Sequence, residues 1–149
     1  MIEDSARALL LTIRQKASEC YSLLGKGYSE AVYQRALCVE FQGAAIPHDL
    51  EVTMSVPYKN HVVGQVRSDI ILRGETPVVI ETKATAAALK PEERWQLSRY
   101  MKILDIPLGV LINFTQVGNA AQPQIEFFLY ENEQFYQYNV DTSQGTVVA

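Results

Sequence analysis

Residues 78–84 read Val-Val-Ile-Glu-Thr-Lys-Ala, and this stretch decides the fold class. An uninterrupted apolar run such as Val78-Val79-Ile80 is typical of a central strand that is buried on both faces. We therefore expect a strand over residues 77–83. The same strand carries Glu81 and Lys83, and side chains two positions apart on a strand project from one face.

Hydrophobic periodicity on either side of this stretch predicts the remaining elements. Apolar residues recur every three or four positions in three segments, which is the spacing of helices with one buried face. In other segments apolar and polar residues alternate, as they do in strands. The sequence therefore predicts an α/β fold with a mixed sheet, in the order α, α, β, β, β, α, β and a final β hairpin. Helices are expected at residues 6–24, 29–41 and 91–104, and further strands at residues 50–58, 61–72, 108–114, 125–130 and 134–140.

The composition is that of an ordinary globular protein, with 48% hydrophobic and 20% charged residues among 149. No repeat or low-complexity tract interrupts the chain, so residues 1–149 are expected to form a single domain. No apolar run approaches the roughly 20 residues that cross a bilayer, so no membrane association is expected. Cys20 and Cys38 lack metal-ligand spacing and are expected to be small core residues of a reduced, cytoplasmic protein.

The charge distribution is more informative than the net charge of −4, which argues against a generic nucleic-acid coat. All 13 Lys and Arg residues lie at or before Lys102, whereas every charged residue within 103–149 is an acid. A near-neutral body with local basic patches binds a phosphate backbone weakly and with strong salt dependence. The acidic C-terminal part is expected to be a solvated face.

Three charged residues stand where strands are expected to be apolar: Asp69, Glu81 and Lys83. Burying an unpaired carboxylate or ammonium costs several kcal/mol, so such groups persist inside a fold only when they are paired or bound to metal. Two interpretations stay open from spacing alone. The three groups form a structural ion network, or they bind a divalent cation such as Mg²⁺, which prefers carboxylate oxygens.

Two predicted helices contribute further polar candidates. Glu30 lies in the first turn of the second helix, where a carboxylate either caps the helix or reaches toward an internal site. Gln96 and Tyr100 are one turn apart on the third helix and share a face. Gln96 on its own would ordinarily be a solvated helix residue.

Two sets of basic residues are candidates for phosphate contact. Arg67 lies two positions before Asp69 on the same strand face, where it either touches a phosphate or pairs with a buried acid. The third helix carries a basic surface, for which solvated charges are the ordinary interpretation. That surface consists of Lys90, Arg94, Arg99 and Lys102.

These motifs together resemble a known family. Gly27-x-x-Glu30-x-x-Tyr33, followed by Ala36-Leu37, is similar to the signature of the GxxExxY proteins, which belong to the PD-(D/E)XK nuclease-like superfamily. The resemblance spans residues 25–114. It takes in Tyr58-Lys59, Arg67-Ser68-Asp69, Glu81-Thr82-Lys83 and Gln96-x-x-x-Tyr100. It implies a restriction-endonuclease-like αβββαβ core, the order that the periodicity predicts independently.

The resemblance also implies roles for these residues. Asp69 and Glu81 would be metal ligands, joined by the carbonyl of Thr82, and Lys83 would position or activate water. Glu30 would bind a second metal or orient a metal-bound water. No proline precedes Asp69, where the superfamily name places one, but that position is loose across the superfamily.

The Gln96 and Tyr100 pair resembles that of recombination-type exonucleases, in which the glutamine would fix the water or a phosphate oxygen. The implied activity is Mg²⁺- or Mn²⁺-dependent hydrolysis of DNA. DNA is thus the implied partner, and it would be bound weakly. The alternative is a catalytically silent nuclease-fold scaffold, which the acidic total favours. A third alternative is a structural domain in which Glu81 and Lys83 form a salt bridge. The oligomeric state stays open, and residues 125–140, rich in Phe and Tyr, are where a homodimer or other partner surface would be sought.

Overall fold

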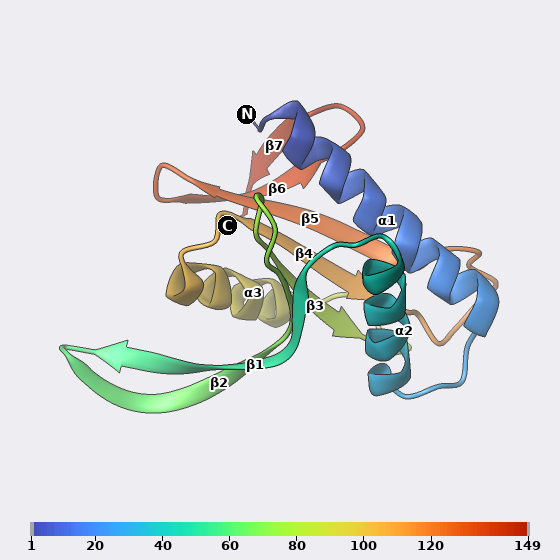
Figure 1. The fold of residues 1–149 in the computed structure, drawn as a ribbon, viewed down its shortest axis with the longest axis horizontal. Helices are drawn as coiled ribbons and strands as arrows, with labels where there is room; N and C mark the ends of the chain where they lie inside the picture. The colour runs from blue at the N-terminus through green and yellow to red at the C-terminus, as the bar shows by residue number, and fades with distance from the viewer. Residues whose placement is uncertain (1, 149) are drawn as a thin grey trace.

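A computed structural model describes residues 2–148 and arranges them as one seven-stranded sheet with helices on both faces (Figure 1). The helices within this range are α1 (Asp4–Leu24), α2 (Glu30–Gly43) and α3 (Pro91–Leu104). The strands are β1 (His48–Tyr58), β2 (His61–Leu72), β3 (Val78–Lys83), β4 (Leu108–Asn113), β5 (Gln124–Glu131), β6 (Gln134–Asn139) and β7 (Gln144–Val147). The predicted α/β class and the αβββαβ order, which here runs from α2 to β4, are confirmed.

The strands lie in the sheet in the order in which they occur along the chain. β3 and β4 are parallel, while every other neighbouring pair is antiparallel. A parallel pair needs a crossover, and α3 supplies it on one face of the sheet. α1 and α2 cover the other face (Figure 1). The ends of β3 and β4 that follow their apolar runs therefore lie side by side, close to the start of α3.

The apolar run in β3 is buried on both faces, as predicted. Val78 and Ile80 belong to the core under α1 and α2, and Val79 belongs to the core under α3. All three side chains are fully buried. This double burial holds the residues that follow, Glu81 to Lys83, in a fixed position at the strand end.

The structure differs from the sequence expectations at two places. β7 was not expected, because its four residues contain Gly145 and only one large apolar side chain, Val147, which is 55% exposed. The second helix is expected from residue 29, whereas α2 begins at Glu30, and Ser29 precedes it without a side-chain capping hydrogen bond.

Two general expectations can also be compared with the fold. Cys20 and Cys38 are free thiols on α1 and α2, and burial, followed by the charge of Glu40, raises the pKa of Cys20 to about 12. None of the helices within residues 2–148 combines the length and the apolar character that a membrane span requires.

A glycine in β4 sets how closely α3 approaches the sheet. A Cβ atom at Gly109 would stand 2.5 Å from the Met101 sulfur and 3.1 Å from Leu97 Cδ1. We expect Gly109→Ala to lower the free energy of unfolding by about 1–3 kcal/mol, as overpacking of a dense core does. Thermal denaturation would show this loss as a fall in the melting temperature of roughly 2–4 °C per kcal/mol. Gly64→Ala on β2 is the control, because no described atom beyond its two chain neighbours lies within 4 Å of the added methyl group.

Candidate active site

The candidate site forms where β2 and β3 diverge. Their backbone pairing ends at Ile70 opposite Ile80. Beyond that pair, Glu81 Oε2 accepts a hydrogen bond from the Asp69 backbone N–H at 2.9 Å. Asp69 Oδ2 accepts one from the Thr82 backbone N–H at 2.8 Å. The two carboxylates thus replace the backbone ladder, and this exchange fixes both acids at the junction of the strands.

Thr82 connects this pair to α2. Its hydroxyl oxygen lies 3.1 Å from Asp69 Oδ2 and 3.2 Å from Glu30 Oε1. Gln34, one turn after Glu30, donates hydrogen bonds to the Thr82 hydroxyl and to Glu30 Oε1, both at 3.0 Å. A hydroxyl group has a single proton to donate, so it can satisfy only one of the two carboxylates at a time.

The site holds more negative charge than its surroundings neutralise. Burial, followed by the neighbouring charge of Asp69, raises the pKa of Glu81 to about 8, although the Asp69 backbone N–H and the Ser68 hydroxyl, each 2.9 Å away, act in the opposite direction. Burial and the charge of Asp69 also raise the pKa of Glu30. Acids in such surroundings favour a bound cation or proton.

Lys83 lies beside this cluster of acids but is not neutralised by an ion pair with any of them. Its charge lowers the pKa of both Glu30 and Glu81, although burial and the charge of Asp69 raise both pKa values more. Lys83 makes no ion pair with any residue that the structure describes, and its side chain is half-buried. The salt bridge between Glu81 and Lys83, which the structural alternative requires, is absent from the described part of the chain.

Gln96 and Tyr100 on α3 face the same cluster of acids. Gln96 Nε2 donates a hydrogen bond to the Tyr100 hydroxyl oxygen at 2.9 Å. Burial raises the pKa of Tyr100, and the charge of Glu81 is the next largest cause. The structure therefore brings together Glu30, Asp69, Glu81, Thr82, Lys83, Gln96 and Tyr100, the seven residues that the sequence singles out, from α2, β2, β3 and α3.

Comparison with known proteins identifies the family of this chain. The family model of the PD-(D/E)XK nuclease superfamily matches residues 7–127. The chain belongs to this superfamily. Its fold is accordingly restriction-endonuclease-like, with a mixed sheet, flanking helices and a C-terminal β hairpin formed by β5 and β6.

Comparison with other proteins adds little to this assignment. The crystal structure of SSO0001 is similar with a TM-score of 0.46 and 21% identity, over 64% of this chain and 48% of that chain. The chain thus spans about half the length of that structure. No curated protein matches the sequence.

PD-(D/E)XK nucleases generally use divalent metal ions. Within residues 2–148, no group of three or more His, Cys, Asp or Glu side chains is arranged as a ready metal site. Mg²⁺ needs fewer, because it keeps several waters and uses one or two carboxylates. Asp69 and Glu81 supply oxygen ligands with uncompensated charge, and the two carboxylates fit such an ion.

Sequence reasoning missed three buried polar residues that hold this PD-(D/E)XK cluster in place. Gln34 and Ser68 donate to the acids, as described above. Asn113, opposite Lys83 in β4, binds the backbone of Thr85 and Ala87 and so orders the loop that follows Lys83. The only available signals were Gln34 four residues after Glu30 and a serine immediately before the strand acid.

The predicted basic surfaces are only partly available to a phosphate. Arg94 pairs with Glu126 at 2.7 Å, so one charge of the α3 surface is neutralised. Arg67 is exposed and makes no ion pair with a described residue. It does not pair with a buried acid, which was the structural alternative for this residue.

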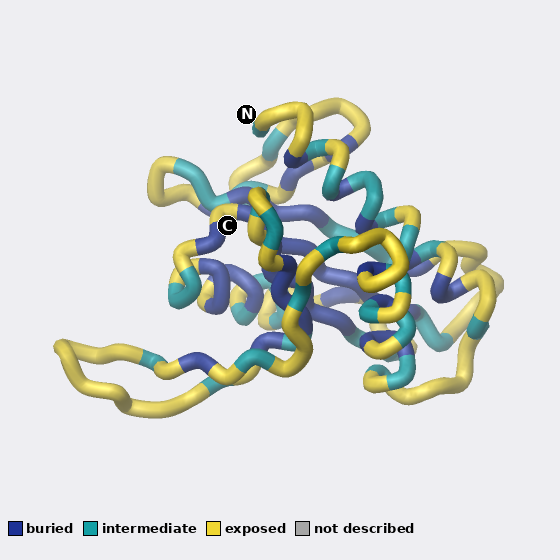
Figure 2. Tube along the Cα trace, viewed as in Figure 1, coloured by how far each residue is buried: buried dark blue, intermediate teal, exposed yellow. Residues whose placement is uncertain are grey.

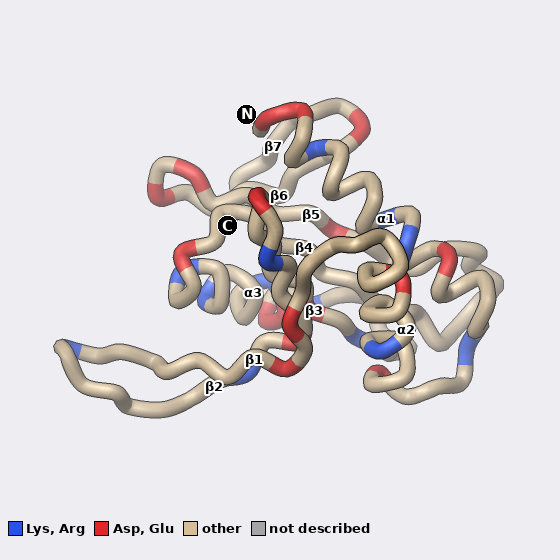
Figure 3. The backbone as a smooth tube through the Cα atoms, in the orientation of Figure 1, with Lys and Arg blue, Asp and Glu red and all other residues tan. Residues whose placement is uncertain are grey.

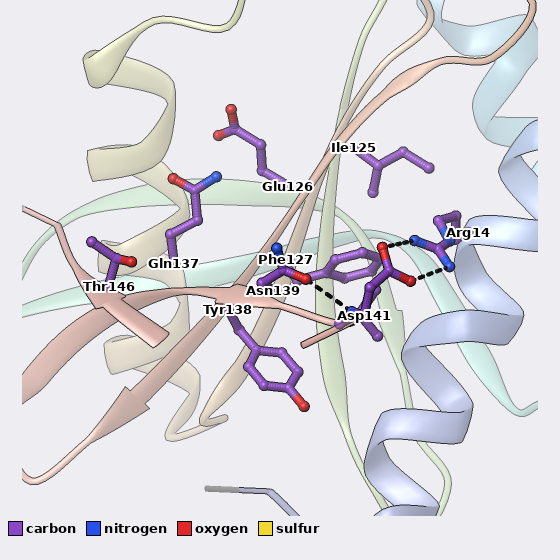
Figure 4. A pocket seen from close by; sticks show the side chains of 10 residues that line it. Arg14, Ile125, Glu126, Phe127, Gln137, Tyr138, Asn139, Asp141 and Thr146 are labelled. Carbon is purple, nitrogen blue, oxygen red and sulfur yellow. Dashed lines mark hydrogen bonds and ion pairs between the residues drawn. The ribbon is translucent and has the colours of Figure 1, made fainter. Parts of the chain in front are cut away.

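A separate hollow of about 370 Å³ lies between α1 and the strands β5 and β6 (Figure 4). The ion pair of Arg14 with Asp141, at 3.0 Å, closes one side, and Asn139 Oδ1 accepts the Asp141 backbone N–H. None of the acids at the candidate site lines this hollow. Its charged side chains are already paired, Arg14 with Asp141 and Glu126 with Arg94, so we assign the chemistry to the strand junction instead.

Proposed function

We propose that this chain is a divalent-metal-dependent nuclease that hydrolyses phosphodiester bonds in DNA, and that it belongs to the GxxExxY branch of its superfamily. One observation carries the proposal: Asp69 and Glu81 are locked together beside Lys83, which has no described ion-pair partner. A purely structural ion network would have paired the lysine with these acids.

Each residue has a role that follows from its position. Asp69, Glu81 and the Thr82 carbonyl would hold Mg²⁺ or Mn²⁺. When bound, the ion supplies positive charge to the attacked phosphate and a water of lowered pKa. Lys83 orients the attacking water and offsets charge on the phosphate.

The supporting residues act around this centre. The carboxylates of Glu30 and Asp69 both lie against the Thr82 hydroxyl. Glu30 orients water or completes a second metal site. Gln96 holds a water or phosphate oxygen, and its hydrogen bond to Tyr100 restricts its side chain. These two residues come from helices on opposite faces of the sheet, so they approach the strand junction from either side.

The test is a cleavage assay on linear duplex, circular duplex and single-stranded DNA. We expect cleavage in Mg²⁺ or Mn²⁺ at a rate about 10³-fold or more above that in EDTA, the scale of a metal-supplied water and charge. Cleavage of the circular form would identify an endonuclease. DNA that is bound but stays intact in both metals would instead favour the silent scaffold, which the acidic net charge of −4 also suits.

A further inference from the structure

The hairpin of β1 and β2 continues well beyond the body of the protein (Figure 1). β2 pairs with β3 only from Ile70 to Leu72, whereas it pairs with β1 as far as its first residue, His61. Residues 52–68 therefore form a two-stranded ribbon that reaches away from the sheet, and most of it is exposed (Figure 2). We call this segment the arm.

The inner half of the arm has one apolar face and one polar face, whereas Val62 and Val63 nearer the tip are both exposed. Met54, opposite Val66, is buried against the core under α3 and anchors the inner part of the arm. Thr53 lies opposite Arg67, and Ser55 lies opposite Gln65. Because side chains alternate along a strand, these four residues share the other face, and all four are exposed.

The charge of the arm differs from that of the rest of the chain. The chain has 17 acidic residues, but residues 52–68 contain none. They contain Lys59 at the turn, Arg67 near the base and His61, and Figure 3 shows blue without red along the projecting ribbon. In a chain of net charge −4, an acid-free projecting ribbon is complementary to a polyanion.

The polar face of the arm leads into the candidate site. Arg67 and Asp69 are two positions apart on β2, so they lie on one face of the strand. The major groove of B-DNA admits a two-stranded ribbon, and hydroxyl, amide and guanidinium groups bind base edges and phosphates. We propose that the face of Thr53, Ser55, Gln65 and Arg67, with Lys59 at the tip, docks duplex DNA for the strand junction. This inference rests on the proposed nuclease function.

The test measures binding without cleavage, with a fluorescein-labelled duplex and fluorescence anisotropy in EDTA at several salt concentrations. We expect the double variant Lys59→Ala with Arg67→Ala to bind at least tenfold more weakly at about 0.1 M salt. The slope of log affinity against log salt should fall by about 2, because two phosphate contacts are lost.

The matched control is Arg14→Ala with Arg73→Ala, which changes the net charge by the same amount. These two arginines already pair with Asp141 and Asp49 at 3.0 and 2.9 Å, so their loss should alter affinity less than about twofold. An equal loss of affinity in both double variants would show that only net charge matters and would overturn the proposal. Failure of the wild-type protein to bind duplex would overturn it as well.

A shortened arm tests the same idea through shape. Replacing residues 56–64 with Asn-Gly joins Ser55 to Gln65 through a two-residue hairpin turn and leaves Met54 in the core. This variant loses Lys59 and the outer half of the arm but keeps the face of Thr53, Ser55, Gln65 and Arg67. We therefore expect an unchanged melting temperature, severalfold weaker duplex binding with a salt slope lower by about 1, and unchanged hydrolysis of the small diester bis(p-nitrophenyl) phosphate.

The remaining outcomes separate the arm from the active site. Retained duplex affinity in the shortened protein overturns the proposal, and so does the loss of a dimer in sedimentation analysis, since the arm would then bind a second copy. Weak binding by the arm variants without any wild-type cleavage supports the arm and removes the nuclease. Normal cleavage by the wild type together with unaltered duplex binding by the arm variants supports the nuclease and overturns the proposal for the arm.

Discussion

Replacing Lys83 with alanine is expected to lower the rate of metal-dependent DNA cleavage about 10³-fold, within the range of a lost group that handles the reacting proton or water. Lys83 follows a fully buried strand segment, and its charge lowers the pKa of Glu81, so its ammonium lies near that carboxylate. It makes no described ion pair. Its loss therefore leaves no broken salt bridge, and the free energy of unfolding should change by less than about 1 kcal/mol.

The measurement is single-turnover cleavage together with a thermal melt. Lys102→Ala, at the exposed end of α3, is the matched control and should keep the rate within about twofold. Lys83→Arg separates two effects, because arginine keeps the charge but lacks the compact ammonium group. Recovery of the rate with arginine would show that charge alone is needed, whereas unchanged cleavage in Lys83→Ala would remove this residue from the mechanism.

The core of the fold was predictable because it depends on local patterns. The run Val78 to Ile80 is apolar on both faces of its strand, and only a central position in a sheet buries both. The strands expected at residues 50–58 and 61–72 leave Lys59 and Asn60 as the turn between them, and both residues have positive φ, as a two-residue hairpin turn requires. β7 was missed, since it pairs only with β6 at the edge of the sheet and its exposed residues carry no alternating pattern.

The residues that support the acids at the site were less predictable than the core, for a different reason. Glu81 and Lys83 interrupt an apolar strand, and the cost of burying charge makes such an interruption visible in the sequence. Glu30 was ambiguous between a cap and an internal ligand, and only the packing of α2 against β3 brings it to Thr82. Gln34 and Ser68 were missed because a single polar residue on a helix or strand has no signal until its partner is known.

Replacing Glu81 with glutamine should abolish the stabilisation of the protein by Mg²⁺. If Asp69 and Glu81 hold the ion, saturating metal at about 100 times its dissociation constant adds about 2.7 kcal/mol of stability to the wild-type protein. For a chain of this size that raises the melting temperature by roughly 5–10 °C. In Glu81→Gln, one of two carboxylate ligands becomes a neutral amide, so the rise should shrink to about 1 °C or less.

The same substitution distinguishes a metal site from a structural network because it keeps the hydrogen bonds. Both bonds to Glu81 reach one oxygen, Oε2, from the Ser68 hydroxyl and the Asp69 backbone, and a glutamine carbonyl can accept both. Repulsion between Glu81 and Asp69 disappears, so the metal-free variant should melt no lower than the metal-free wild type. Glu75→Gln in an exposed loop is the control and should keep the full response to Mg²⁺. If instead Glu81→Gln melts several degrees lower in EDTA and still responds to Mg²⁺, the carboxylate serves the fold and the ion binds elsewhere.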